Sequence, residues 1–173
     1  MNFNAATIQR FFQCFAGGDF RGMQACLHPA VEFRDIGFDL TGKKQVGAMW
    51  HMICEKGTRI MFRDIRLDDQ DSTGNTWLVH WECNYEFAKE EGDKPRPIHN
   101  KIDSRFTFAG DGLICIHHDE CDFHVWAAQA LGEVIDIADK VAEKLHMEFL
   151  RSKVREKAQE KLAAFIKKHP EYA

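Results

Sequence analysis

The acidic residue best placed for chemistry in this sequence is Asp35. Val31, Phe33 and Asp35 alternate along a short predicted strand, so their side chains share one face of that strand. The other two residues are apolar, which indicates that this face turns toward the interior of a curved sheet. A carboxylate on such a face loses hydration, and its pKa rises toward the range of a general base. A structural role remains open, in which Asp35 caps the following loop or pairs with a cation.

His80 and Glu82 form a second polar pair. They lie two residues apart on a longer predicted strand, so their side chains share a face, with roughly 7 Å between their Cα atoms. Either face of a sheet can be covered, so alternation does not decide which face lines a pocket. His80 and Glu82 therefore line a site or lie outside, against a partner subunit. The opposite, more apolar face carries Trp77, Val79, Trp81, Cys83, Tyr85 and Phe87.

The segment from His117 to His124 is rich in residue types that bind metals. On a strand these side chains divide between two faces, whereas zinc requires about four convergent ligands. The sequence also lacks the GxGxxG, P-loop, GxSxG and HExxH motifs. We therefore predict no metal site and no cofactor. One face carries His117, Asp119 and Cys121, and the other carries His118, Glu120, Asp122 and His124.

Hydrophobic periodicity predicts the elements that must position these residues. Three early segments repeat apolar residues at helical spacing, and Gly17, Pro29 and Gly57 mark where these helices end. Alternating segments between Gly- and Asp-rich turns predict strands. The predicted helices cover residues 4–16, 20–27 and 42–55, the predicted strands cover 31–35, 58–69, 77–87, 98–109 and 113–123, and a closing turn is predicted over 125–132.

Residues 133–173 have a different character. They contain no Gly, a single Pro at position 170, and two apolar stripes at helical spacing among many charges. This pattern predicts one long helix, or two helices joined near residues 150–152. Such a segment could strengthen a dimer, cover a pocket or bind a partner protein. The second stripe consists of Val154, Ala158, Leu162, Phe165 and Ile166.

Two segments together resemble the nuclear transport factor 2-like, or SnoaL-like, superfamily. They are AGGDFRGMQACLHPAVEFRDIGFDLTGKKQVGAMW (Ala16 to Trp50) and ICIHHDECDFHVWAAQALG (Ile114 to Gly132). The resemblance implies an α+β cone over residues 1–132, with three N-terminal helices packed on a strongly curved, mainly antiparallel sheet, and a helical C-terminal extension over residues 133–173. This fold hosts isomerases, hydrolases, cyclases and non-catalytic modules, and its members often dimerise through the sheet, so we expect a homodimer.

The ketosteroid isomerases of this superfamily place their base at the position that matches Asp35. The Tyr of their oxyanion hole falls on Phe11, which cannot donate a hydrogen bond. Their second acid falls near Ser104, with Asp103 one residue away on the opposite face. The resemblance therefore implies a base at Asp35 but not steroid-type isomerisation.

The limonene-epoxide hydrolases of the superfamily give a second comparison. They use an Arg-x-Asp pair on a middle strand and an Asp on the last strand, and the matching positions are His80, Glu82 and Asp119. A His in place of the Arg changes the chemistry, because an imidazole can itself accept a proton. The resemblance thus makes Asp35, Asp119, His80 and Glu82 the candidate catalytic residues. The alternative is a polar lining that only binds.

Aromatic residues at helical spacing usually pack in a core, but a cone of this kind also implies a cavity. Fourteen Phe and four Trp would make that cavity apolar and suited to a small hydrophobic or aromatic molecule. The predicted ligand-contacting residues are Phe11, Phe15, Trp50, Trp81, Arg105 and Trp126.

The composition narrows the partners and the location. With 173 residues, 45% apolar content and a net charge of −4, the chain suits one domain with an appendage and gives no reason to expect a nucleic acid or a membrane as partner. We expect neither a secretory signal nor a membrane span, and six scattered Cys are typical of reduced thiols in a cytoplasmic protein. Two functions remain open: an acid–base enzyme of isomerase, hydrolase or cyclase type acting on a small apolar molecule, or a non-catalytic ligand-binding or dimerisation module.

Overall fold

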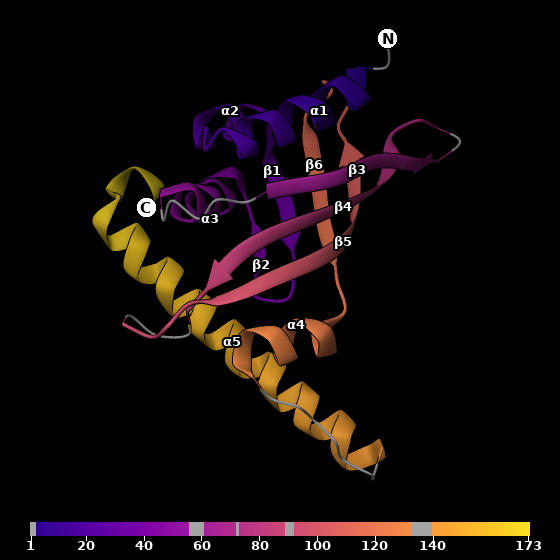
Figure 1. The fold of residues 1–173 in the computed structure, drawn as a ribbon. Coiled ribbons are helices and arrows are strands. Elements are labelled where there is room, and N and C mark those ends of the chain that lie inside the picture. Colours follow the sequence, from indigo (N-terminus) through magenta and orange to yellow (C-terminus); the bar gives the residue numbers. More distant parts are fainter. Residues whose placement is uncertain (1–2, 56–60, 72, 89–91, 133–139) are drawn as a thin grey trace.

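A six-stranded mixed sheet forms the framework of the protein. The computed structural model describes residues 3–55, 61–71, 73–88, 92–132 and 140–173. The strand order is β2-β1-β6-β5-β4-β3, and all neighbours are antiparallel except β1 and β6, which are parallel (Figure 1). The predicted mainly antiparallel sheet is thus confirmed. The strands are β1 (Leu27–Arg34), β2 (Asp39–Thr41), β3 (Met61–Gln70), β4 (Thr76–Phe87), β5 (Arg96–Phe108) and β6 (Ile114–Glu120).

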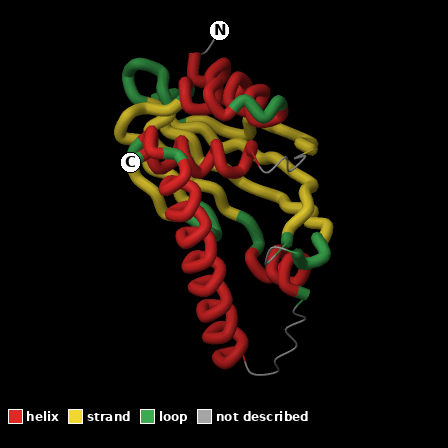
Figure 2. The backbone as a smooth tube through the Cα atoms, turned by 90° about the vertical axis from the view of Figure 1, so that its left-hand side faces the viewer, coloured by secondary structure: helices red, strands yellow, loops and turns green. Residues whose placement is uncertain are grey.

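Three N-terminal helices cover one face of the sheet, which confirms the predicted α+β architecture (Figures 1 and 2). Two more helices follow the last strand. None of the helices in the described part of the chain is both long and apolar enough to cross a membrane. The helices are α1 (Phe3–Ala16), α2 (Phe20–Ala25), α3 (Lys43–Glu55), α4 (Phe123–Leu131) and α5 (Lys140–Lys168), with a 3-10 turn η1 (Pro170–Tyr172) at the end.

The predicted closing turn over residues 125–132 is wrong, because this segment lies in helix α4. The Asp122 side chain starts the helix by accepting hydrogen bonds from the backbone N–H groups of His124 (2.9 Å) and Val125 (3.1 Å). Gly132 ends it with a positive φ of 72°. A run of alanines with an N-cap and a glycine C-cap therefore specifies a short helix.

The burial of the strand residues decides which sheet face is interior. On β4, Val79, Trp81 and Cys83 are buried, whereas His80 and Glu82 point to the other side. Phe106 of β5 and Phe33 of β1 face the same interior and meet Phe11, Phe12 and Trp50 of the helices. The hydrophobic effect thus assigns the apolar face of β4 to the core, which leaves its polar face outside.

Helix α5 is one continuous helix of 29 residues that runs past the open end of the sheet (Figures 1 and 2). Met147 and Leu150 are buried against α4 and β5, and Leu162 and Phe165 belong to the main core. Between these contacts, the Ala158 Cβ lies 3.3 Å from the position that a Cβ on Gly37 would occupy. α5 therefore covers the turn that follows β1, which contains Asp35.

Candidate functional site

Asp35 and Asp119 lie next to each other on the inward face of the sheet. β1 and β6 are parallel neighbours in which Phe33 pairs with His117 and Arg34 pairs with His118, so the next residues along the two strands are Asp35 and Asp119. Asp35 lies two residues after Phe33, and Asp119 lies two residues after His117. Phe33 and His117 point inward and are at most 1% exposed, so the alternation along each strand turns the two aspartates inward as well. The parallel pairing therefore joins two carboxyl groups that are far apart in the sequence.

A tight turn fixes the carboxyl group of Asp35. Its Oδ1 accepts hydrogen bonds from the backbone N–H groups of Gly37 (2.7 Å) and Phe38 (2.6 Å), and its own N–H donates to the carbonyl of Phe38 (3.0 Å). Burial, together with the nearby charge of Asp119, raises the pKa of Asp35 to about 7, although the two backbone hydrogen bonds oppose this rise. Asp35 thus caps the loop and also titrates near neutral pH.

Asp119 is the end of a buried hydrogen-bond network. The Trp81 Nε1–H donates to Ser104 Oγ (2.7 Å), and the Ser104 hydroxyl donates to Asp119 Oδ1. The same carboxylate oxygen lies 2.8 Å from His117 Nε2. Ser104 and His117 are each 1% exposed, so this network is shielded from water. Ser104 occupies the region where the isomerase comparison placed a second acid, and here it positions Asp119.

His117 lies inside a cage of aromatic rings. The ring centroids of Phe106, Phe33, Phe11 and Trp50 are 4.2, 5.1, 5.3 and 5.8 Å from that of His117. The Nδ1 of His117 and the Nε1 of Trp50 are buried and have no hydrogen-bond partner in the described part of the chain. Together with Nε of Arg155 on α5, these two nitrogens are the buried side-chain polar atoms without a partner in the described residues, and a ligand that reached the interior could pair with them.

His80 and Glu82 do not join this site, because they lie on the opposite face of β4. There, His80 Nδ1 is 2.8 Å from Asp103 Oδ1, and His99 Nε2 is 2.8 Å from Glu82 Oε2. Lys101 Nζ lies 3.5 Å from the other oxygen of Glu82. The four predicted catalytic residues thus form two separate groups, and the expected trio of His80, Glu82 and Asp119 does not assemble. The apolar residues that alternate with His80 and Glu82 along β4 lie on the face of the strand that packs in the core.

The comparisons with known proteins agree with this fold. The profile of the SnoaL-like domain matches residues 8–117. The chain belongs to the SnoaL-like family. A comparison with curated protein sequences gives no match. A fold of this family is used for several reactions, so membership alone assigns none of them.

Several solved structures resemble this SnoaL-like chain. A putative polyketide cyclase from Xanthomonas campestris pv. campestris has a TM-score of 0.64 and 18% identity over 73% of this chain and 96% of that chain. A putative polyketide cyclase from a Silicibacter species has a TM-score of 0.65 and 22% identity, over 75% and 96%. An LEH-like epoxide hydrolase from M. tuberculosis has a TM-score of 0.56 and 16% identity, over 75% and 90%. At these identities the likeness is one of fold.

Most of the predicted ligand-contacting aromatics pack inside this SnoaL-like core. Phe11, Phe15, Trp50 and Trp81 touch one another edge to face, for example at 5.0 Å between the ring centroids of Phe15 and Trp50. Trp126 belongs to a second cluster beneath α5, where its Nε1–H donates to the Tyr85 hydroxyl (2.9 Å). These rings therefore fill the interior in the structure described.

Arg105 lies away from the aromatic interior. It is exposed on the outer face of β5, where it pairs with Leu78 of β4 in the sheet register. Its neighbours Ser104 and Phe106 are the inward residues of that strand. The prediction that Arg105 contacts a ligand together with the aromatics is thus not supported by its position, because the backbone alternation points it outward.

Thiols close to the two carboxyl groups are not activated as nucleophiles. Burial raises the pKa of Cys121 and of Cys83, to about 11 and about 12 respectively, and nearby Asp119 contributes to both rises. Burial also raises the pKa of the Tyr85 hydroxyl. These groups stay protonated at neutral pH, whereas the pKa of Asp35 is raised to about 7.

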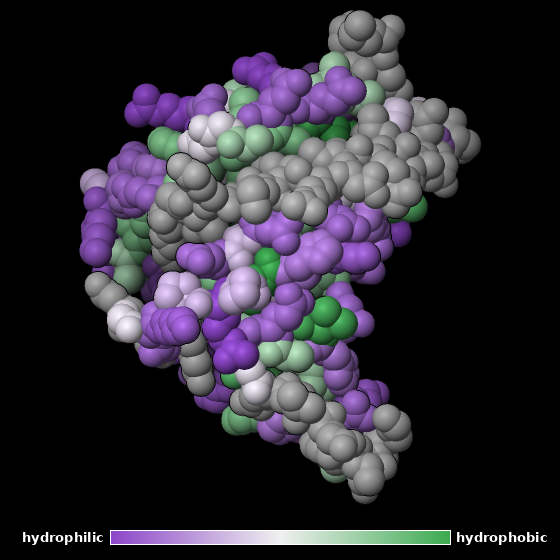
Figure 3. Space-filling model, viewed as in Figure 1, coloured by the Kyte–Doolittle hydropathy of each residue, from purple (hydrophilic) through white to green (hydrophobic). Residues whose placement is uncertain are grey.

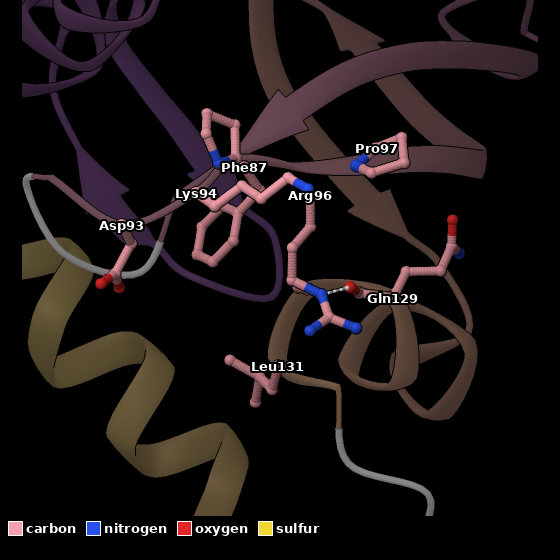
Figure 4. A pocket seen from close by; sticks show the side chains of 9 residues that line it. Phe87, Asp93, Lys94, Arg96, Pro97, Gln129 and Leu131 are labelled. Carbon is pink, nitrogen blue, oxygen red and sulfur yellow. Dashed lines mark hydrogen bonds between the residues drawn. The ribbon is translucent and has the colours of Figure 1, made fainter.

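An open depression of about 610 Å³ lies elsewhere, between β5 and the end of α4 (Figure 4). Arg96 is one of the residues that line it. The Arg96 Nε–H donates to the backbone carbonyl of Gln129 (2.7 Å). Gln129 is near the C-terminus of α4, where a cation is favoured. None of the predicted site residues lines this depression. The lining residues are Phe87, Asp93, Lys94, Pro95, Arg96, Pro97, Gln129, Ala130 and Leu131.

Proposed function

We propose that this SnoaL-like protein catalyses proton transfer on a small apolar molecule, with Asp35 as the general base. The observation that carries the proposal is the inward position of Asp35 beside Asp119, where burial and the second carboxylate raise the pKa of Asp35 to about 7. A carboxyl group that titrates near neutral pH is present in both protonation states. It can therefore accept a proton in one step and return it in another.

Asp119 would act as the fixed negative charge beside this base. The Ser104 hydroxyl donates to its carboxylate, and His117 Nε2 lies 2.8 Å from the same oxygen. If the Nε2–H of His117 donates to this oxygen, Nδ1 of a neutral ring is an acceptor, while the Trp50 Nε1–H is a donor. One acceptor and one donor in an aromatic surrounding suit a molecule that is mostly apolar and carries one or two oxygen atoms.

The reaction class is narrowed by the kinds of protein that share the fold. The similar structures include putative polyketide cyclases, an LEH-like epoxide hydrolase and a putative isomerase. Cyclisation through a carbanion, the opening of an epoxide by water and a proton-shift isomerisation all require a base and a returning proton, and Asp35 can supply both. These three reaction types are therefore the ones to test first in this chain.

The route to Asp35 would pass beneath α5. Ala158 of this helix lies against the turn that contains Gly37, and Ile36 of the same turn packs in the cluster of Met147 and Leu150. A ligand that reaches Asp35 from the open end of the sheet must therefore displace or slide along this helix. This arrangement would exclude water from the site during proton transfer.

The decisive experiment compares Asp35→Asn with Asp103→Asn, a matched change on the outer face. Purified variants are assayed against a panel of small apolar ketones and epoxides, and folding is checked by circular dichroism. We expect Asp35→Asn to lower turnover by about 100-fold or more, because a positioned base contributes that much, and Asp103→Asn to retain it. Equal turnover in both variants would remove Asp35 from the mechanism.

A non-catalytic ligand-binding module is the second candidate. The observation in its favour is that aromatic side chains fill the interior around His117 and that α5 closes over Asp35. Such a module would retain an apolar molecule without converting it. Native mass spectrometry of the purified protein would then show a bound small molecule of constant mass, in the wild type and in Asp35→Asn alike.

We also propose a homodimer in the cytoplasm. The outer face of β4 and β5 supports the dimer: Leu78 is 41% exposed there, among paired polar side chains. The coloured residues of the view in Figure 3 are mostly hydrophilic, with a few hydrophobic patches between them. The six free cysteines support a reducing compartment. Light scattering after size-exclusion chromatography tests the dimer, and Leu78→Glu should shift it toward the monomer.

A further inference from the structure

A group of side chains that could bind a metal ion lies apart from Asp35, where the C-terminal residues pack against α3. His51 of α3, His169 after α5 and Glu171 of η1 each offer one ligand atom, and these three atoms lie within 4.8 Å of one another. We propose that His51, His169 and Glu171 bind a divalent transition-metal ion, with zinc as the best match to two imidazoles and one carboxylate.

The spacing within this group suits an ion rather than a direct ion pair. Nδ1 of His169 is 3.5 Å from Glu171 Oε1, which is longer than a good hydrogen bond. Ligand atoms at about 2 Å from a tetrahedral zinc are roughly 3.3 Å apart. Glu55, one helical turn after His51 on α3, places an oxygen 3.8 Å from Nε2 of His169 and brings a further negative charge to the site.

His51 is held in an orientation that leaves one nitrogen for a metal. Its ring stacks on Phe20 with 3.6 Å between the centroids, and its Nδ1 lies 3.1 Å from the hydroxyl of Tyr172. That hydroxyl also accepts a hydrogen bond from Gln24 Nε2 (2.9 Å). An imidazole that binds a metal through one nitrogen characteristically donates its other N–H to such a partner.

His169 and Glu171 lie on a turn whose position is fixed by other contacts. Gln24 Nε2 donates both to the Tyr172 hydroxyl (2.9 Å) and to the backbone carbonyl of Gly47 on α3 (3.0 Å). The C-terminal turn is also held in place by other contacts, because Lys44 Nζ donates to the backbone oxygen of Ala173 (2.5 Å). The proposed ligands are thus brought together before any ion binds, which reduces the entropic cost of binding.

Binding of an ion would join α3 to the end of α5. His169 follows α5 directly and its ring stacks on Phe165, which belongs to the main core. A metal that binds the folded chain therefore stabilises the docked position of this helix in proportion to its concentration. This proposal does not depend on Asp35, so either one can fail without the other.

The test is a titration of the full chain with Zn²⁺, and with Co²⁺ as a spectroscopic substitute. Calorimetry should show one site with a micromolar or lower dissociation constant, Co²⁺ should give visible absorption bands of a tetrahedral nitrogen–oxygen site, and Zn²⁺ should raise the thermal midpoint. His169→Asn and Glu171→Gln should each weaken binding by about tenfold or more. The exposed His124→Asn is the matched control and should bind like the wild type.

Three outcomes would overturn the proposal. They are no Zn²⁺ binding by the wild type at micromolar concentration, undiminished affinity in both His169→Asn and Glu171→Gln, or the same loss in His124→Asn. Glu171 is 58% exposed, so Glu171→Gln leaves the fold intact and a loss of affinity in this variant reports on the ligand itself. The circular dichroism spectrum of each variant confirms that comparison.

Discussion

The inner and outer faces of the sheet carry the same residue types in opposite environments. On the inner face, the side chains of His117 and Asp119 are 1% and 10% exposed, and their neighbours are aromatic rings and the carboxyl group of Asp35. On the outer face, a hydrogen bond from His99, aided by the charge of Lys101, holds the pKa of Glu82 below its usual range. The partners of a carboxyl group, rather than its place on a strand, thus decide whether it can transfer protons near neutral pH.

Removal of residues 140–173 should have the largest effect on the inner side of the sheet, because Leu162 and Phe165 belong to the main core and Met147 and Leu150 pack with α4. The truncation exposes the apolar residues that pack against Met147, Leu150, Leu162 and Phe165. The lost burial costs about 1.5–3 kcal/mol of stability for each of these four side chains. Their sum is comparable with the total stability of about 5–15 kcal/mol of a typical domain. We expect the shortened chain to lose its cooperative thermal transition, measured by circular dichroism.

A change on the exposed side of the same helix is the control for that truncation. Leu145 is 61% exposed, so Leu145→Ala should leave the thermal midpoint unchanged. A soluble, cooperatively folding chain of residues 1–139 would instead show that residues 140–173 are a separable extension.

Asp119→Ala probes the buried network directly. The substitution leaves the Ser104 hydroxyl and His117 Nε2 without their partner, and each unpaired buried group costs about 1–3 kcal/mol. We expect the free energy of unfolding in urea to fall by about 2–6 kcal/mol. Asp103→Ala, on the outer face of β5, should cost far less. Similar losses in the two variants would mean that the two faces do not differ.

Asp35→Asn should alter the pH dependence of stability. The pKa of Asp35 is raised from 3.8 to about 7 in the folded chain, so the folded state retains a proton that the unfolded state has released between these values. Stability from this group is therefore present at low pH and is lost as pH rises from about 4 to about 7, by up to about 1.4 kcal/mol per unit. The unfolding free energy of the wild type, minus that of Asp35→Asn, should therefore decrease as pH rises over that range. A flat difference would place the Asp35 pKa near its ordinary value.

Glu82→Gln should have the smallest effect. The pKa of Glu82 is lowered by its hydrogen bond with His99, so the stability that it contributes is present at neutral pH and is lost as pH falls through the acidic range. Solvent and salt screen a pair of this kind. We expect a thermal midpoint within experimental error of the wild type in high salt, with a small decrease in low salt. A large decrease in high salt would give the outer face an unexpected structural role.

The sequence predicted the sheet and the inward position of Asp35 for a clear physical reason. Alternation along Val31, Phe33 and Asp35 is a local property, and so is the helical spacing of the N-terminal aromatics. The same local argument could not choose between the two faces of β4, since both are compatible with a covered sheet. Burial in the structure made that choice and separated His80 and Glu82 from Asp119.

The pairings between distant segments were beyond local arguments. Asp35 meets Asp119 only because β1 and β6 are parallel neighbours, and His51 meets His169 only because the end of the chain returns to α3. Periodicity contains no information on which strand lies beside which. The signals that could have found α4 were present, because Asp122 and Gly132 bracket an alanine-rich segment in the manner of helix caps.

The pairing of the first strand with the last has a consequence for biosynthesis. As the chain leaves the ribosome, β1 can pair only with the three-residue β2, and its other edge stays open until β6 has been made. Contacts that span so much of the chain form late and slowly. Until then Asp35 is not enclosed beside Asp119, and the open strand edge of a nascent or prematurely terminated product is a target for chaperones.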